Sequence, residues 1–462
     1  MSGRSAGRAG SDAGLRRRAG AFPPRSQSSS PQFGLPRALP THRVSVSLLA
    51  SAGRPMNDSR DSLVWRLALR HAAIAYVVSR ICVIAGAAIV GAELRADDNK
   101  IRERLIWGYF AKPDPHAREA VLPRSAGSMI LDVLTSWDGI WYMRIVRRGY
   151  PSFVPDGITY DDPEARVAFF PAYPGLVRAV DRVLPGGDTF AALFLNLVLG
   201  AVFIVLVGLL TRAWFGAEHA RMAMVLTAIF PGSFVLSFAY SEALLLVLAA
   251  ACLLALTRER WLLAGVLAAL ATTTRPNGIA VVAACAIASV IAIRTKRQWS
   301  SLIAPLLAPT GFLFFQWWID RHTGESRVWF RVQGEAWKEG ASFGLTAIRN
   351  TLEAFTKPLT SPTDLITAVS FLCTFLLVWV AWKRGLPPIA AAYSAVIVAL
   401  MLLPATVTAR PRFLFTAFPL VIVAALWLES DKRKHWWPYV MATSGAGLVA
   451  LTALYGVYGA IP

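Results

Sequence analysis

An aspartate flanked by aromatic residues is the strongest candidate for chemistry in this chain of 462 residues. Asp138 follows Trp137 and precedes Trp141 and Tyr142, in a polar stretch that comes after the first long apolar run. A carboxylate at the depth of lipid headgroups can deprotonate a hydroxyl that attacks a lipid-linked donor, and partial desolvation raises its basicity. The pattern therefore predicts a general base at a membrane surface. The alternative is that Asp138 only caps a helix by accepting hydrogen bonds from free backbone N–H groups.

Two arginines in later polar connections are candidates for binding a phosphate. Arg275 and Arg412 each lie beside a proline, and a planar guanidinium can hold two phosphate oxygens and neutralise a departing phosphate. Glu242 could orient an acceptor or pair with one of these arginines. A helix terminus is the alternative for Arg275, and a topological anchor is the alternative for each of these charges. Arg80, near the middle of the first apolar run, is costly there unless it meets an anion, a polar cavity or a neighbouring helix.

The remaining candidates for substrate contact are aromatic, amide and cationic side chains in the same set of connections. They are Trp137, Tyr142, Tyr173, Tyr240, Asn277, Gln333, Trp337 and Arg410. Gln333 and Trp337 are groups of the kind that contact sugar hydroxyls and rings, with interfacial anchoring as the alternative for the aromatic residue. The sequence has no Walker loop, no glycine fingerprint of a dinucleotide fold and no histidine metal motif. This argues against nucleotide hydrolysis and against a soluble nucleotide-sugar domain.

Apolar runs near bilayer-spanning length must position these groups. The chain is 55% hydrophobic and 16% charged, which is too apolar for one water-soluble core. The predicted spans cover about 71–92, 189–211, 221–237, 243–257, 261–274, 277–293, 301–319, 365–382, 387–405, 412–428 and 438–458. We therefore predict an all-α, multi-pass membrane protein with about eleven transmembrane helices, for which the lipid bilayer is the solvent.

The distribution of Lys and Arg among the connections sets the orientation of these spans. With the amino terminus in the cytoplasm, cytoplasmic connections carry twelve cations and the short outer connections carry three, a fourfold bias. The twelve are Arg212, Arg221, Arg258, Arg260, Arg294, Lys296, Arg297, Lys383, Arg384, Lys432, Arg433 and Lys434. The three are Arg275, Arg410 and Arg412. This orientation places the candidate site on the extracytoplasmic face of the plasma membrane.

The first outer connection is predicted to contain two helices that lie on the membrane surface. Apolar and aromatic residues recur at helical spacing over Trp137–Val146. The segment Phe169–Leu184 carries Arg178, Asp181 and Arg182, which make it a poor span and a good amphipathic helix. Keeping this segment outside leaves the carboxyl terminus outside as well.

The net charge of +19 does not indicate nucleic-acid binding, because the basic residues follow membrane topology. The first sixty residues alone carry ten arginines against Asp12 and Asp58. Residues 1–60, rich in Ser, Arg, Gly and Pro, are predicted to be a disordered basic extension, with Met56 as an alternative start. Residues 61–462 would form the membrane domain. The four cysteines lie in apolar segments without the spacing of a disulfide framework or a zinc site.

Five motifs together resemble the PIG-V mannosyltransferases, which are related to the second mannosyltransferase of glycosylphosphatidylinositol synthesis and belong to the membrane glycosyltransferases of GT-C type. The motifs are Trp137-Asp138 followed by Gly149-Tyr150, Ala168-Phe169-Phe170-Pro171 with Tyr173-Pro174, Tyr240-Ser241-Glu242, Arg275-Pro276-Asn277-Gly278, and Arg412-Phe413 followed by Phe418-Pro419. The resemblance covers roughly residues 70–430, in order, and Gln333 with Trp337 is similar to a weaker family pattern.

The resemblance implies a polyprenyl-phosphate-mannose donor, an inverting transfer that forms an α-mannoside, and a catalytic aspartate at Asp138. The composition, rich in Ala and Arg, is typical of a bacterium with GC-rich DNA, so the acceptor expected is a cell-envelope glycolipid, a lipoglycan or a protein. We expect no cofactor and no metal, with a divalent ion at Asp138 and Glu242 as the alternative. Other function classes are a flippase for lipid-linked sugars, guided by Arg80 and the outer arginines, and a non-catalytic subunit of an envelope complex.

Overall fold

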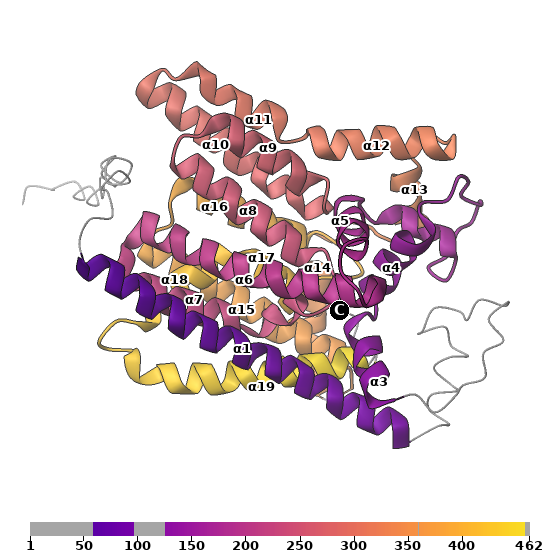
Figure 1. Ribbon diagram of the computed structural model, residues 1–462, viewed down its shortest axis with the longest axis horizontal. Coiled ribbons are helices and arrows are strands. Elements are labelled where there is room, and N and C mark those ends of the chain that lie inside the picture. Colours follow the sequence, from indigo (N-terminus) through magenta and orange to yellow (C-terminus); the bar gives the residue numbers. More distant parts are fainter. Residues whose placement is uncertain (1–58, 97–124, 359, 458–462) are drawn as a thin grey trace, which may run out of the picture. The chain divides into compact units, whose positions relative to one another are not determined.

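The computed structural model describes residues 59–96, 125–358 and 360–457, and their regular structure is helical (Figure 1). Ala341 and Pro404 form an isolated β-bridge, and these three ranges contain no β-strand. The predicted all-α fold class is therefore confirmed. The predicted basic extension and the alternative start at Met56 lie outside the described residues, apart from the two residues that begin the first helix.

The described residues form α-helices together with several short 3-10 helices. The α-helices are α1 (Ser59–Ala96), α3 (Ala126–Leu134), α4 (Asp138–Arg148), α5 (Ala172–Asp181), α6 (Gly187–Phe215), α7 (Ala220–Ile229), α8 (Glu242–Thr257), α9 (Trp261–Thr272), α10 (Ile279–Lys296), α11 (Ile303–Leu307), α12 (Thr310–Thr323), α13 (Val328–Glu335), α14 (Leu345–Thr356), α15 (Pro362–Arg384), α16 (Pro388–Leu402), α17 (Pro411–Thr416), α18 (Phe418–Leu428) and α19 (Trp437–Gly456). Short 3-10 helices are η2 (Pro163–Ala168), η3 (Ala217–His219), η4 (Pro231–Leu236), η5 (Pro276–Gly278), η6 (Trp299–Leu302) and η7 (Lys434–Trp436).

Six helical stretches in the described part of the chain are long and apolar enough to cross a bilayer. They are Asp61–Ala92, Gly187–Phe215, Pro276–Lys296, Trp299–Thr323, Pro362–Arg384 and Lys434–Gly456. The ends of α6 show how the sequence sets such lengths. Gly186 and Gly216, with φ of 119° and 113°, flank an apolar run without a helix breaker. The chain is thus a multi-pass membrane protein.

The other predicted spans are shorter or interrupted. The apolar helices of 10–17 residues are Glu242–Thr257, Trp261–Thr272, Pro388–Leu402 and Phe418–Leu428. At about 1.5 Å per residue they cover roughly 15–26 Å, less than the hydrocarbon core of about 30 Å. Proline removes a backbone donor, and Pro231 and Pro411 each begin a short helix, η4 and α17. Polar residues can therefore enter the bundle at the ends of these short helices.

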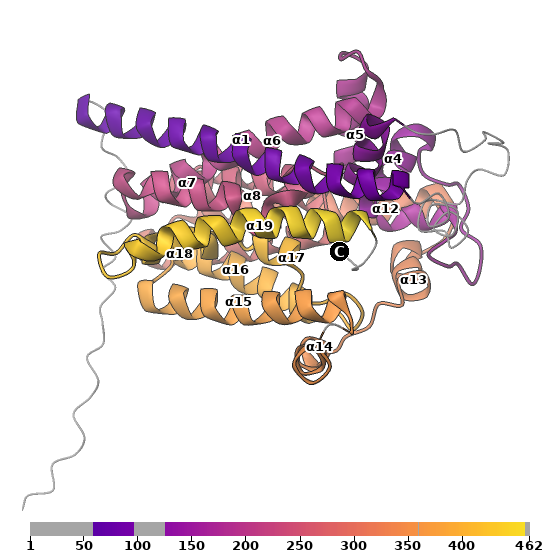
Figure 2. The same ribbon diagram turned by 90° about the horizontal axis from the view of Figure 1, so that it is seen from below.

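Contacts between connections show which helix ends meet. Three pairs join the basic connections: Arg212 with Asp61, His219 with Glu429, and Lys296 with Glu259. The start of α1 and the end of α6 therefore lie at the same end of the bundle. In Figures 1 and 2 the helices run side by side from this end, on the left, to a second end on the right, where α4, α5 and α13 lie. The basic connections and the candidate motifs thus occupy opposite ends.

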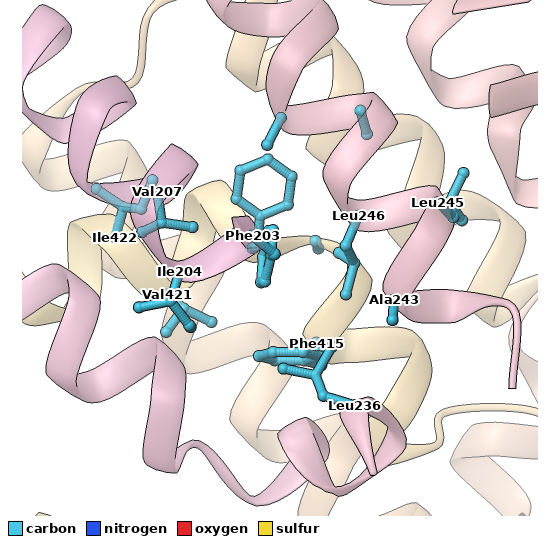
Figure 3. Close-up of a cluster of buried hydrophobic side chains, with 14 of the residues drawn as sticks. Phe203, Ile204, Val207, Leu236, Ala243, Leu245, Leu246, Phe415, Val421 and Ile422 are labelled. Atoms are coloured by element: carbon cyan, nitrogen blue, oxygen red, sulfur yellow. The ribbon is translucent and has the colours of Figure 1, made fainter. Parts of the chain in front are cut away.

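Aromatic packing in the core fixes the position of α17. Phe203 of α6 meets Phe415 of α17 edge to face, with ring centroids 5.9 Å apart (Figure 3). Phe203 also meets Phe418 of α18 at 5.2 Å. The backbones of η4 and α17 approach so closely that a Cβ atom at Gly232 would clash with the carbonyl oxygen of Pro411. Because a larger residue would separate the two segments, glycine at this position keeps the start of α17 beside η4.

Helices α4 and α5 correspond to the two surface helices predicted in the first outer connection. The α5 helix packs on α4 and α6 and buries Tyr173 completely. Its Arg178 donates hydrogen bonds of 2.6 and 2.7 Å to the carbonyl oxygens of Ile145 and Val146 in the last turn of α4. A cation at this position interacts favourably with the carbonyl groups at the C-terminal end of the helix. This contact holds α4, and the aspartate at its start, against the bundle.

Candidate active site

Asp138 is the first residue of α4, and its carboxylate points to two arginines. Trp137 occupies the N-cap position with a φ of 55°, which is uncommon for a bulky residue. Its indole Nε1 donates a hydrogen bond of 3.0 Å to the carbonyl oxygen of Tyr455 in α19, and this bond helps to hold the unusual backbone. Oδ2 of Asp138 lies 2.8 Å from Nη1 of Arg412 and 3.4 Å from Nη2 of Arg275. Asp138 is thus a partner of guanidinium groups rather than only a helix cap.

Glu242 completes a cluster of two acidic and two basic side chains, which we call the ion cluster (Asp138, Glu242, Arg275, Arg412). Its Oε2 lies 2.7 Å from Nη1 of Arg275, and its Oε1 lies 3.5 Å from Nη1 of Arg412. The side chain of Glu242 is 1% exposed, and that of Asp138 is 17% exposed. Each arginine therefore contacts both carboxylates, and the four formal charges cancel.

Each member of the ion cluster stands at a helix end or a helix break. Glu242 begins α8, Arg275 lies in extended backbone between α9 and η5, and Arg412 belongs to α17. These are the short and interrupted helices of the bundle. The cluster can therefore lie deeper in the bundle than the ends of the longer helices. The low dielectric constant of the surrounding protein strengthens electrostatic interactions there.

The arginines set the charge state of Asp138. Burial raises the pKa of the Asp138 carboxyl, but the charges and hydrogen bonds of Arg412 and Arg275 outweigh burial and hold the pKa below its ordinary value. The carboxylate is therefore ionised at neutral pH. While both guanidinium groups contact it, the same interactions make it a weak base.

Hydroxyl groups extend the cluster toward α5. The hydroxyl of Tyr142 lies 2.6 Å from Oγ of Ser241, which also accepts a hydrogen bond of 3.2 Å from Nη1 of Arg275. Burial raises the pKa of Tyr142, so the phenol stays protonated at neutral pH. Tyr173 packs edge to face on Tyr142 at 5.1 Å and supports it from α5. The motif residues therefore form a continuous polar and aromatic wall.

Trp141, one helical turn after Asp138 on α4, belongs to a cluster of four aromatic side chains, which we call the aromatic group (Trp141, Tyr160, Phe169, Trp337). Trp141 contacts Tyr160, Phe169 and Trp337, with ring centroids 5.4, 5.9 and 5.8 Å apart. Tyr160 and Trp337 also contact each other at 5.5 Å. Trp337, predicted as a substrate contact, is thus packed against the helix that carries Asp138.

Three predicted site residues lie apart from the ion cluster. Arg410 is buried but donates to Oγ1 of Thr367 and to the carbonyl oxygen of Thr363, which is 3.4 Å away. Asn277 lies in η5 beside Arg275, and Gln333 lies in α13 beyond the aromatic group. The roles of these amide side chains in substrate binding stay predictions.

Sequence reasoning missed two residues of this region. Tyr455 holds Trp137 through its carbonyl oxygen, and Tyr160 belongs to the aromatic group. A tyrosine at the end of the last span is also typical of an interfacial anchor, so the type and position of Tyr455 did not distinguish it. Tyr160 lies in a polar stretch without a periodic pattern.

Comparisons with known proteins support part of this picture. Residues 171–319, about a third of the chain, match the family model described as dolichyl-phosphate-mannose-protein mannosyltransferase. No curated protein matches the sequence. The matched segment contains Glu242 and Arg275 and excludes Asp138 and Arg412.

Two solved structures show how far the similarity extends. ArnT from Cupriavidus metallidurans bound to undecaprenyl phosphate is 13% identical, with a TM-score of 0.43, 69% of this chain covered and 62% of that chain covered. The apo oligosaccharyltransferase of Archaeoglobus fulgidus is 15% identical, with a TM-score of 0.36, and 82% of this chain and 55% of that chain are covered. The chain thus spans about three fifths of the length of ArnT and is similar, over residues 171–319, to a family of lipid-phosphate-mannose-dependent mannosyltransferases.

Proposed function

We propose that this protein is a membrane glycosyltransferase of GT-C type that transfers mannose from polyprenyl-phosphate mannose to an acceptor hydroxyl. The single observation that carries the proposal is the ion cluster, in which Asp138 is held by two arginines at one end of a membrane bundle. The match of residues 171–319 to the mannosyltransferase family model supports the donor class. The resemblance of the five motifs to the PIG-V family supports mannose and an α-linked product.

The orientation of the bundle supports an extracytoplasmic site in the plasma membrane. The basic connections gather at the end where Asp61 contacts Arg212, and the ion cluster lies at the other end. Positive charge is retained on the cytoplasmic side of membrane proteins. The donor's phosphate would then reach the cluster from the outer leaflet, and the acceptor would be an envelope glycolipid, a lipoglycan or a protein.

The transfer step follows from the groups of the ion cluster. The acceptor oxygen attacks C1 of the mannose on the face opposite the phosphate, and the bond between C1 and the phosphate oxygen breaks. The electron pair leaves with polyprenyl phosphate, whose charge Arg412 and Arg275 stabilise, while the hydroxyl proton passes to Asp138. Inversion at C1 turns a β-linked donor into an α-mannoside. The residues named here require no cofactor for this step.

Binding of the donor would also activate the base. In the structure Asp138 and Glu242 hold both arginines, and a donor phosphate must compete with them for the same N–H groups. When the phosphate displaces Asp138 from Arg412, the influence of burial on the carboxylate remains and its basicity rises. Glu242 would keep Arg275 in place. The arrangement therefore couples deprotonation of the acceptor to the presence of the donor.

The aromatic group beside α4 is our proposal for the acceptor side of the site. Tyr160 is 38% exposed, and with Trp337 it presents aromatic edges next to the helix that carries Asp138. Gln333, four residues before Trp337, offers an amide for sugar hydroxyls. Arg80 gives no support to the flippase alternative, because its guanidinium donates to the hydroxyls of Ser233 and Ser237 within the bundle.

The proposal is tested by transfer of radiolabelled mannose from polyprenyl-phosphate mannose in membranes that carry the protein. Loss of a positioned general base lowers rates by roughly 10²–10⁴-fold, so Asp138→Asn should transfer almost no label. Asp188→Asn is the matched control, because Asp188 also pairs with an arginine, Arg147, but on the exposed side of α4. Equal labelling by wild type and Asp138→Asn at equal insertion would remove Asp138 as the base.

A further inference from the structure

Buried polar atoms without a hydrogen-bond partner gather around Arg412. Within the described residues they include Nε of Arg412, Oε1 of Glu242 and the hydroxyl oxygens of Tyr240 and Tyr455. The four side chains are between 0% and 6% exposed. Native structures leave few buried polar atoms unpaired, and a group of them at one place is typical of a site where a polar ligand binds.

Contacts tie the two tyrosines to the ion cluster from different parts of the chain, the connection between η4 and α8 and the last turn of α19. The guanidinium carbon of Arg412 lies 5.7 Å from the ring centroid of Tyr240, which immediately precedes the Ser241-Glu242 pair. Tyr455 comes from the last turn of α19, and its backbone carbonyl oxygen accepts a hydrogen bond from Trp137, the residue before Asp138.

Two contacts fix the ring of Tyr455, so its hydroxyl has a defined place. Its carbonyl oxygen accepts the hydrogen bond from Trp137, and its ring meets Phe234 of η4 edge to face at 4.7 Å. Phe234 in turn packs on Phe238, which packs on Tyr240 at 5.3 Å. The two phenols are thus joined by a continuous aromatic chain.

We propose that Tyr455, together with Tyr240, donates a hydrogen bond to an oxygen of the phosphate that Arg412 holds. This inference rests on the proposed function, because the phosphate would be that of the polyprenyl-phosphate donor or product. The arginines are already balanced by Asp138 and Glu242, so a phosphate brings excess negative charge. Neutral phenols can donate to its remaining oxygens without adding further positive charge beside the two arginines.

Binding of undecaprenyl phosphate to the purified full-length chain tests this role. Tyr455→Phe keeps the ring and the carbonyl oxygen that holds Trp137, so it removes the hydroxyl alone. A hydrogen bond to a charged group contributes enough that we expect affinity to fall roughly tenfold or more in Tyr455→Phe, with a similar fall in Tyr240→Phe. Tyr76→Phe is the matched control, because the hydroxyl of Tyr76 donates to the carbonyl oxygen of Leu197 in the bundle.

Inorganic phosphate serves as the second probe. A loss in Tyr455→Phe with both probes identifies the phosphate group as the ligand, and a loss with undecaprenyl phosphate alone identifies a lipid headgroup. Unchanged affinity in Tyr455→Phe and Tyr240→Phe, while Arg412→Gln loses affinity, would overturn the inference and leave the proposed function standing. If the wild-type chain binds neither probe, the inference and the proposed donor site both fail.

Discussion

Two buried guanidinium groups in this bundle differ in what they contact. Arg80 and Arg412 are each 6% exposed. Within residues 59–96, 125–358 and 360–457, Arg80 donates to neutral acceptors, among them the hydroxyl of Ser237 at 2.7 Å and the carbonyl oxygen of Ser233 at 3.0 Å. Arg412 instead faces Asp138 at 2.8 Å and retains an Nε without a partner. Equal burial therefore does not indicate an equal role.

The partners of the two guanidinium groups distinguish a structural arginine from a ligand-binding arginine. Arg80 links α1 to η4 through several hydrogen bonds, which a competing anion would have to break together. Arg412 is held by carboxylates, and an anionic ligand can replace one of them without leaving the guanidinium unpaired. We therefore expect substitution of the two arginines to have different effects on transfer and on stability, and we expect only Arg412 to bind an anionic ligand.

The largest contrast is expected when each arginine is replaced by glutamine. Arg412→Gln removes a group that stabilises the leaving phosphate, and loss of one such donor typically lowers turnover by roughly 10²–10³-fold. Transfer of radiolabelled mannose per mole of folded protein measures this effect. A rate within a few fold of wild type would place Arg412 outside the reaction.

Arg80→Gln should affect the fold rather than the reaction. It removes hydrogen bonds between α1 and η4, so we expect the free energy of unfolding to fall by about 1–3 kcal/mol. Transfer per mole of folded protein should stay within a few fold of wild type. Thermal unfolding in detergent and the transfer assay separate the two effects, and a specific loss of transfer would break the comparison.

A smaller effect is expected in the dependence of transfer on pH. Arg412 and Arg275 lower the folded-state pKa of Asp138, so the carboxylate stays ionised as pH falls. The contribution of this carboxylate to the free energy of unfolding is therefore lost only as pH falls through the lowered pKa. Without Arg412, the influence of burial is less opposed and the pKa rises. The acid limb of residual transfer in Arg412→Gln should therefore lie at higher pH than in wild type. An unchanged limb would show that another group controls it.

The sequence was sufficient to predict that the four residues of the ion cluster lie at one end of the fold. Helices that alternate in direction return every second connection to the same side, so Asp138, Glu242, Arg275 and Arg412 could be grouped from the positions of basic residues alone. The pairing within the cluster could not be predicted, because it depends on where short helices stop. Pro411 turns the chain between Arg410 and Arg412, and only the second arginine meets Asp138.

Other features needed three-dimensional packing. Tyr455 reaches the site because α19 packs along α1 and η4, a contact between segments that are distant in the sequence. Trp337 contacts α4 through Trp141, although nearly two hundred residues separate them. Hydropathy marks such residues as apolar or interfacial, but it contains no information about which helices become neighbours.

In the proposed mechanism, Asp138 competes with the donor phosphate for Arg412 and Arg275. Measuring how tightly Asp138→Asn binds undecaprenyl phosphate tests this competition directly. The substitution removes the competing charge and keeps a side chain of similar size. The account predicts that Asp138→Asn binds undecaprenyl phosphate more tightly than wild type while it transfers no mannose. Equal or weaker binding by this variant, with its fold intact, would contradict the account.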